Sequence, residues 1–203
     1  MDDQPQGRQP RTLTRSQFLK TLYLTELALV VLSFVITGLT DQRLFPFGFT
    51  FAAESLLLGL GSAVPIALLV LLASVGPVSQ LGWIKRAMAG IKVRLKQVLG
   101  STMLSLTAVD IVLLSAAAGF AEELFFRGLL QSYIGVIGSA FVFGLSHALT
   151  PAYFVMATAI GLYFGYLYEV SGNLLIPMVG HAVYDVFALY LLRWEFTRSY
   201  SDR

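Results

Sequence analysis

The sequence lacks cysteine altogether, which excludes disulfides, thiolate nucleophiles and cysteine-based metal sites. Charge is also scarce, since only 13% of the 203 residues are Asp, Glu, Lys or Arg, whereas soluble globular domains carry about a quarter. There are only two histidines, and no Pro-, Gly- or Ser-rich linker divides the chain. Any catalysis must therefore use Glu, Asp, His, Ser, Thr or Tyr within a single domain.

Hydrophobic residues make up 56% of the chain. They gather in runs, several of which are long enough to cross about 30 Å of hydrocarbon at about 1.5 Å per residue. The predicted fold class is therefore all-α, a polytopic transmembrane helix bundle of about six membrane helices. We expect a disordered polar tail at residues 1–16 and one integral-membrane domain at residues 17–203. The six predicted helices cover residues 18–39, 51–75, 103–130, 134–149, 152–169 and 174–192.

Residues 76–100 differ from these runs because they alternate apolar residues with five basic ones and contain no acidic residue. The basic residues are Lys85, Arg86, Lys92, Arg94 and Lys96. The pattern predicts a basic amphipathic helix on the membrane surface, with binding of lipid or a partner as a second possibility. Because basic clusters mark the cytoplasmic side, we expect both termini to be cytoplasmic. The net charge of +2 reflects this orientation, and no nucleic-acid partner is expected.

Two adjacent carboxylates and an arginine interrupt the apolar run at residues 103–130: Glu122, Glu123 and Arg127. An ionisable side chain inside a bilayer costs at least a few kcal/mol, so these three need partners or a purpose. Glu123 and Arg127 are four residues apart and can pair on one helical face. Glu122 points about 100° away from Glu123 and is free to face a cavity. We therefore assign Glu123 and Arg127 a supporting role.

Both histidines, His147 and His181, fall within predicted membrane helices. His181 and Asp185 are four residues apart and share a helical face. Together with Glu122 they come from three helices, which is how helix bundles build sites. Glu122 could act as general base on a water with help from His147, while His181 and Asp185 stabilise an oxyanion. Alternatively, Glu122 and both histidines could hold Zn²⁺ with an open fourth position.

Either chemistry predicts hydrolysis of an amide bond in a membrane-buried site. One alternative is a non-catalytic membrane scaffold, immunity factor or regulator. Another is a proton- or ion-coupled carrier, although the two halves of the chain lack the inverted repeat typical of many transporters. The remaining acidic residues of the apolar regions are expected to be interfacial or structural: Glu26, Glu54, Asp110 and Glu169. The oligomeric state is left open.

Three motifs resemble the signatures of the CPBP intramembrane proteases, which include CAAX prenyl endopeptidases and bacteriocin-processing or self-immunity (Abi) proteins. They are Glu122-Glu123-x-x-x-Arg127, Phe143-x-x-x-His147 and His181-x-x-x-Asp185, and the resemblance covers about residues 103–192. It implies that Glu122 activates water with His147 as its partner, and that His181 and the residue four later stabilise the oxyanion. It also implies a membrane substrate, of which a prenylated peptide is one form. Both metal-dependent and metal-free mechanisms have been assigned to this family.

Asp185 departs from the family pattern, which often has Asn at this position. An amide can donate a hydrogen bond to an oxyanion, whereas an ionised carboxylate cannot. Asp185 must therefore be protonated, orient His181 or bind a metal.

Overall fold

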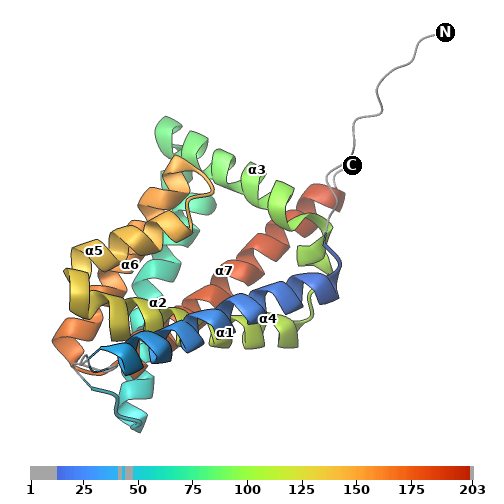
Figure 1. Ribbon diagram of the computed structural model, residues 1–203. Coiled ribbons are helices and arrows are strands. Elements are labelled where there is room, and N and C mark those ends of the chain that lie inside the picture. Colours follow the sequence, from blue (N-terminus) through green and yellow to red (C-terminus); the bar gives the residue numbers. More distant parts are fainter. Residues whose placement is uncertain (1–12, 41–42, 44–47, 202–203) are drawn as a thin grey trace.

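Helices make up all the regular structure of the residues that a computed structural model describes, 13–40, 43 and 48–201 (Figure 1). They are α1 (Arg15–Leu39), α2 (Ala53–Ser74), η1 (Pro77–Gln80), α3 (Gly82–Ser105), α4 (Ala108–Glu123), η2 (Leu124–Leu130), α5 (Gln131–Ser146), α6 (Pro151–Ser171) and α7 (Leu175–Ser201). η1 is a 3₁₀-helix and η2 is a π-helix. The all-α prediction is confirmed for this part of the chain.

Four helices in the described part of the chain are long and apolar enough to cross a membrane: α1, α2, α6 and residues Leu175–Arg198 of α7. The protein is therefore a multi-pass membrane protein by helix length and composition. Six spans are not shown for the described residues. α4 and α5 have 16 residues each and are by themselves shorter than the about 20 residues that a span needs, and α4 continues directly into η2.

The predicted helix at residues 103–130 is wrong at its beginning. α3 continues to Ser105, and α4 begins only at Ala108. Thr107 forms a capping box with Asp110: the Asp110 backbone donates to Thr107 Oγ1 at 3.1 Å, and Thr107 N donates to Asp110 Oδ2 at 2.6 Å. Such a box fixes a helix beginning. A run that is continuous in hydrophobicity is therefore divided by two polar residues.

Asp110 also ties the beginning of α4 to the beginning of α1. Arg15 donates from Nη2 to Asp110 Oδ1 at 2.7 Å and from Nε to Oδ2 at 2.8 Å. The Arg15 guanidinium holds the pKa of the Asp110 carboxyl well below its usual range. The structural role expected of Asp110 is thus confirmed. Since α1 begins at Arg15, helix starts inside the predicted tail at residues 1–16, of which residues 1–12 lie outside the described part.

Small residues let the helices that carry the polar motifs approach closely. α7 packs most extensively against α2 and α4, and α5 against α6. A Cβ added at Gly119 of α4 would lie 2.8 Å from the backbone nitrogen of Ala182, and one at Gly161 of α6 would lie 3.1 Å from Ala140 Cα. These glycines bring backbones together as small residues do in membrane bundles, so α4 packs closely against α7 and α6 against α5.

The basic segment forms η1 and α3, and α3 crosses one end of the bundle in Figure 1. The backbone turns within it at Gly100, where φ is +45°. Lys85, Arg86 and Arg94 are exposed, whereas Ile91 is buried. The helix is thus amphipathic, as the sequence predicts, and its apolar side faces the protein. Its position at a membrane surface stays a prediction.

Candidate active site

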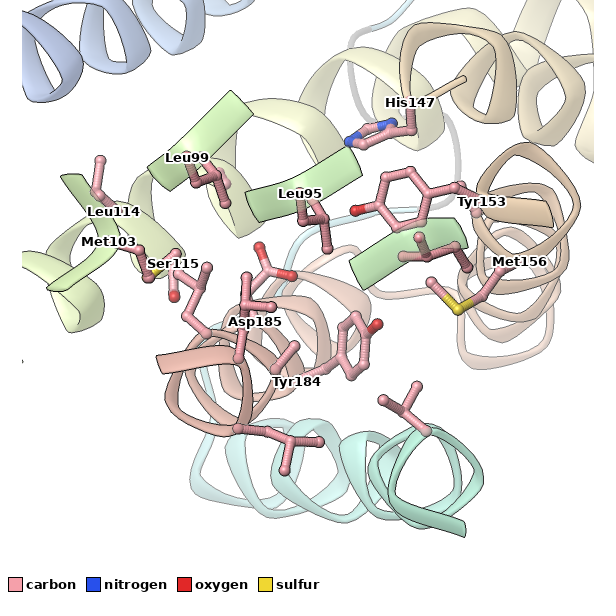
Figure 2. A pocket seen from close by; sticks show the side chains of 18 of the residues that line it. Leu95, Leu99, Met103, Leu114, Ser115, His147, Tyr153, Met156, Tyr184 and Asp185 are labelled. Carbon is pink, nitrogen blue, oxygen red and sulfur yellow. The ribbon is translucent and has the colours of Figure 1, made fainter. Parts of the chain in front are cut away.

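A cavity of about 440 Å³ lies beneath α3 and between α1, α4, α6 and α7. All four residues of the predicted site line it: Glu122, His147, His181 and Asp185. Figure 2 shows His147 and Asp185 facing the same space, with Tyr153 and Tyr184 beside them and Leu95 and Leu99 of α3 over it. The fold therefore brings together side chains that lie more than sixty residues apart in sequence.

Glu122 stands between the two histidines. Its Oε2 lies 3.8 Å from His147 Nε2 and 3.9 Å from His181 Nε2. These separations are too long for direct hydrogen bonds, but one water could contact the carboxylate and an imidazole at the same time. Glu122 Oε2 is buried and has no hydrogen-bond partner among the described residues. A carboxylate oxygen in this state is available to a water or a substrate.

His147 follows the last residue of α5, and contacts with Phe143 fix the orientation of its ring. Its Nδ1 lies 2.9 Å from the carbonyl oxygen of Phe143, and the two rings pack with centroids 4.4 Å apart. A carbonyl can only accept, so Nδ1 carries the hydrogen. The Nε2 that faces Glu122 is consequently the basic nitrogen of the neutral ring.

His181 is held by Glu123, a contact that sequence reasoning missed. Its Nδ1 lies 2.7 Å from Glu123 Oε1, and its ring stacks on Phe164 at 5.4 Å. Carboxylate-bound imidazoles are fixed in both orientation and tautomer. Since His181 lies on α7 and Glu123 on α4, the missing signal was the packing of these two helices, which no spacing within one helix reveals.

The predicted pair of Glu123 and Arg127 is confirmed. Arg127 Nη1 donates to the same Oε1 of Glu123 at 2.8 Å, and Nη2 donates to the Gly161 carbonyl at 3.1 Å. The side chains are 0% and 1% exposed. Glu123 thus binds both Arg127 and His181. The supporting pair is therefore in direct contact with a residue of the predicted site.

Immediately after the two glutamates, the helix widens into the π-helix η2. Such turns are rare and often occur at functional sites. One backbone carbonyl of η2 is bonded from α5: Ser139 Oγ donates to the Phe126 carbonyl at 2.6 Å. Gln131, which follows η2, donates to the Gly165 carbonyl at 3.1 Å. The sequence gives no clear signal for this widening.

Asp185 faces the histidine that precedes it by one turn. Its Oδ2 lies 3.6 Å from His181 Nε2, which is beyond hydrogen-bond distance. Both Glu122 and Asp185 therefore surround one nitrogen of His181 with acidic oxygens. This arrangement would stabilise a positively charged imidazole, because opposite charges a few ångströms apart favour the charged form.

Further polar residues line the cavity outside the predicted site, among them Glu26, Tyr153 and Tyr184. Glu26, expected to be interfacial or structural, is only 9% exposed. The signal available in the sequence was an acidic residue inside an apolar run. Its relation to the site depends on α1 packing against α4, which the sequence does not specify.

The zinc set expected from Glu122, His147 and His181 does not form a metal-binding group here. Within the described ranges, no three or more His, Asp or Glu side chains are arranged to hold a metal ion. Zinc at this site stays a prediction.

Comparison with known proteins shows which class of protein the region that carries the motifs is similar to. Residues 104–187 match the family described as type II CAAX prenyl endopeptidase Rce1-like. This segment contains all three motifs, so the resemblance to CPBP intramembrane proteases is confirmed over it.

A particular relative is the protein described as uncharacterized protein YpbD of Bacillus subtilis (strain 168), which is 36% identical over 91 residues. The match covers 43% of this chain and 48% of that protein, so it spans about half the length of the relative. No solved structure matches.

Proposed function

We propose that the protein is an intramembrane endopeptidase that hydrolyses a peptide bond with a water activated by Glu122 and His147. The observation that carries the proposal is a convergence at the wall of one cavity. A carboxylate oxygen that has no hydrogen-bond partner in the described part of the chain lies within 3.9 Å of two imidazole nitrogens. The family match over residues 104–187 supports the same reaction class.

In the proposed reaction, Glu122 takes a proton from water while the water oxygen attacks the peptide carbonyl carbon. The carbonyl oxygen becomes an oxyanion as its double bond opens, and His181, charged and donating from Nε2, stabilises it. The proton then passes to the leaving nitrogen from Glu122 or His147, and the C–N bond breaks. General acid–base catalysis and oxyanion stabilisation each contribute about 100-fold or more.

Asp185 contributes through His181 rather than by donating to the oxyanion. A carboxylate 3.6 Å from His181 Nε2 favours the imidazolium, which has a hydrogen to donate at that nitrogen. In this proposal the third motif still stabilises the oxyanion, as the resemblance implies. Asp185 does so through its charge on His181, not as an amide that donates a hydrogen bond.

The substrate is a membrane-associated peptide or protein, with a prenylated peptide as one form. Much of the cavity wall is apolar, with Leu95 and Leu99 of α3 on one side and Leu114 of α4 on another. Its volume of about 440 Å³ lies within the range of roughly 300–1,000 Å³ usual for small-ligand sites. We further propose that both termini are cytoplasmic, since α3 exposes Lys85 and Arg86.

The test is cleavage of a panel of membrane peptides by purified protein in which Glu122→Gln or His147→Ala has been introduced. We expect Glu122→Gln to lower kcat by at least about 100-fold, with the unfolding temperature unchanged. Glu169→Gln, on an exposed position of α6, is the matched control and should retain full activity. Cleavage by Glu122→Gln at the wild-type rate would refute the proposal and favour a non-catalytic scaffold.

A further inference from the structure

Glu26 is a carboxylate of the cavity wall that the proposed reaction does not use. It lies on α1, is only 9% exposed, and lines the same cavity as Glu122. Its Oε2 is buried, and no group of the described residues hydrogen-bonds to it. Burying a polar atom without a partner is costly, so such atoms in native proteins ordinarily have a partner or a function.

The cavity contains more acidic than basic side chains. The titratable residues that line it with possible charge at neutral pH are Glu26, Lys92, Glu122, His147, His181, Asp185 and Glu195. With all four carboxylates ionised and both imidazoles protonated, the carboxylates of this lining exceed the cations by one. An incoming cation would therefore be favoured and an incoming anion disfavoured.

The lysine of the lining does not neutralise Glu26. Lys92 Nζ lies 2.7 Å from Glu195 Oε1 and 3.4 Å from the carbonyl oxygen of Ser74. Behind the cavity, Arg127 is bound to Glu123, so that pair is balanced internally. Because the surroundings of the cavity are apolar, the unbalanced charge is screened less than it would be in water.

We propose that Glu26 is a specificity-determining residue that binds a cationic group of the substrate, a lysine or arginine side chain close to the cleaved bond. The inference rests on the proposed peptidase function and names its substrate class. Peptides with a basic residue at this position should be preferred over neutral peptides, and peptides that place a carboxylate there should be rejected.

The test uses membrane peptides that are identical except for one residue, which is Lys, norleucine or Glu and is moved through the positions on either side of the cleaved bond. Binding is measured in His147→Ala protein reconstituted in lipid nanodiscs, which keeps every carboxylate of the cavity, and cleavage in protein that retains His147. At one position, we expect the Lys peptide to bind about tenfold more tightly than the norleucine peptide, the factor typical of one charge-assisted hydrogen bond. Glu26→Gln should abolish this ratio, and Glu26→Lys should invert it in favour of the Glu peptide.

The matched control is Glu54→Gln, which removes an exposed carboxylate of α2 that does not line the cavity and should keep the ratio. Equal binding of the Lys and norleucine peptides at every position would overturn the inference. A purely structural Glu26 would also overturn it: Glu26→Gln would then lower the unfolding temperature and leave the ratio unchanged.

The two proposals fail in different ways. Cleavage by the wild-type protein without any preference for Lys overturns the cationic site and leaves the peptidase intact. Selective binding of the Lys peptide that depends on Glu26, with no cleavage of any peptide, supports the cationic site and overturns the peptidase.

Discussion

Substitution by glutamine should have different effects at the two adjacent glutamates: Glu123→Gln should lower the stability of the fold, and Glu122→Gln should lower activity. Glu123→Gln is the more informative change. Glu123 is completely buried and its Oε1 receives hydrogen bonds from Arg127 at 2.8 Å and His181 at 2.7 Å. Glutamine keeps the size of the side chain but removes its charge. Arg127, which is 1% exposed, would then be a buried cation without a counterion.

Removing one partner of a buried ion pair costs about 3–5 kcal/mol. The two hydrogen bonds lie within the same charged network, so their loss is part of this figure. For a chain of 150–250 residues, each kcal/mol lowers Tm by about 2–4 °C, which predicts a fall of roughly 6–20 °C. Glu122 is different, because its Oε2 has no hydrogen-bond partner among the described residues.

The assay is thermal unfolding of the purified protein in detergent, followed by intrinsic fluorescence, alongside peptide cleavage. Glu123→Gln should lower Tm strongly, whereas Glu122→Gln should lower activity at nearly unchanged Tm. The double variant Glu123→Gln with Arg127→Met removes both charges and should recover part of the lost Tm. A Tm for Glu123→Gln within about 2 °C of wild type would contradict the reasoning, since it would mean that the buried arginine needs no counterion.

Three further outcomes are expected. Asp185→Asn should lower kcat about tenfold with little change in KM because His181 loses a facing carboxylate; a faster variant would instead make this position a hydrogen-bond donor. The purified protein should remain active after exhaustive chelation and should contain no stoichiometric metal by elemental analysis. Loss of activity on chelation and its recovery with Zn²⁺ would instead establish a metal mechanism. Asp110→Asn should lower Tm at pH 7, and the gap from wild type should close as pH falls below about 4, because a carboxyl whose pKa is lowered by folding stabilises only while ionised; a gap independent of pH would contradict this.

Spacing within single helices predicted the local relations of the site well. The i, i+4 rule placed Arg127 against Glu123 and left Glu122 to face a cavity. The same rule put Asp185 beside His181. These relations depend only on helical geometry, which neighbouring helices do not alter. The catalytic roles of the four residues stay predictions.

What the sequence did not reveal depends on contacts between helices. The bond between Glu123 and His181 requires α4 against α7, and the burial of Glu26 requires α1 against the cavity. The division at Thr107 was missed because hydropathy continues across it, although the capping box there is short and local. The covering of the cavity by Leu95 and Leu99 depends on how α3 folds back over the bundle.

Because η2 lies between the motifs that contain Glu122 and His147, the orientation of these motifs relative to each other depends on the number of residues in η2. A π-turn amounts to one residue inserted into an α-helix, and one residue corresponds to a rotation of about 100°. Glu122 precedes η2, and His147 follows it at the end of α5. Deleting a single residue such as Leu129 would keep every functional group of the site and yet turn the two motifs away from each other. Chain length through η2 is therefore as much a part of the site as the side chains that line it.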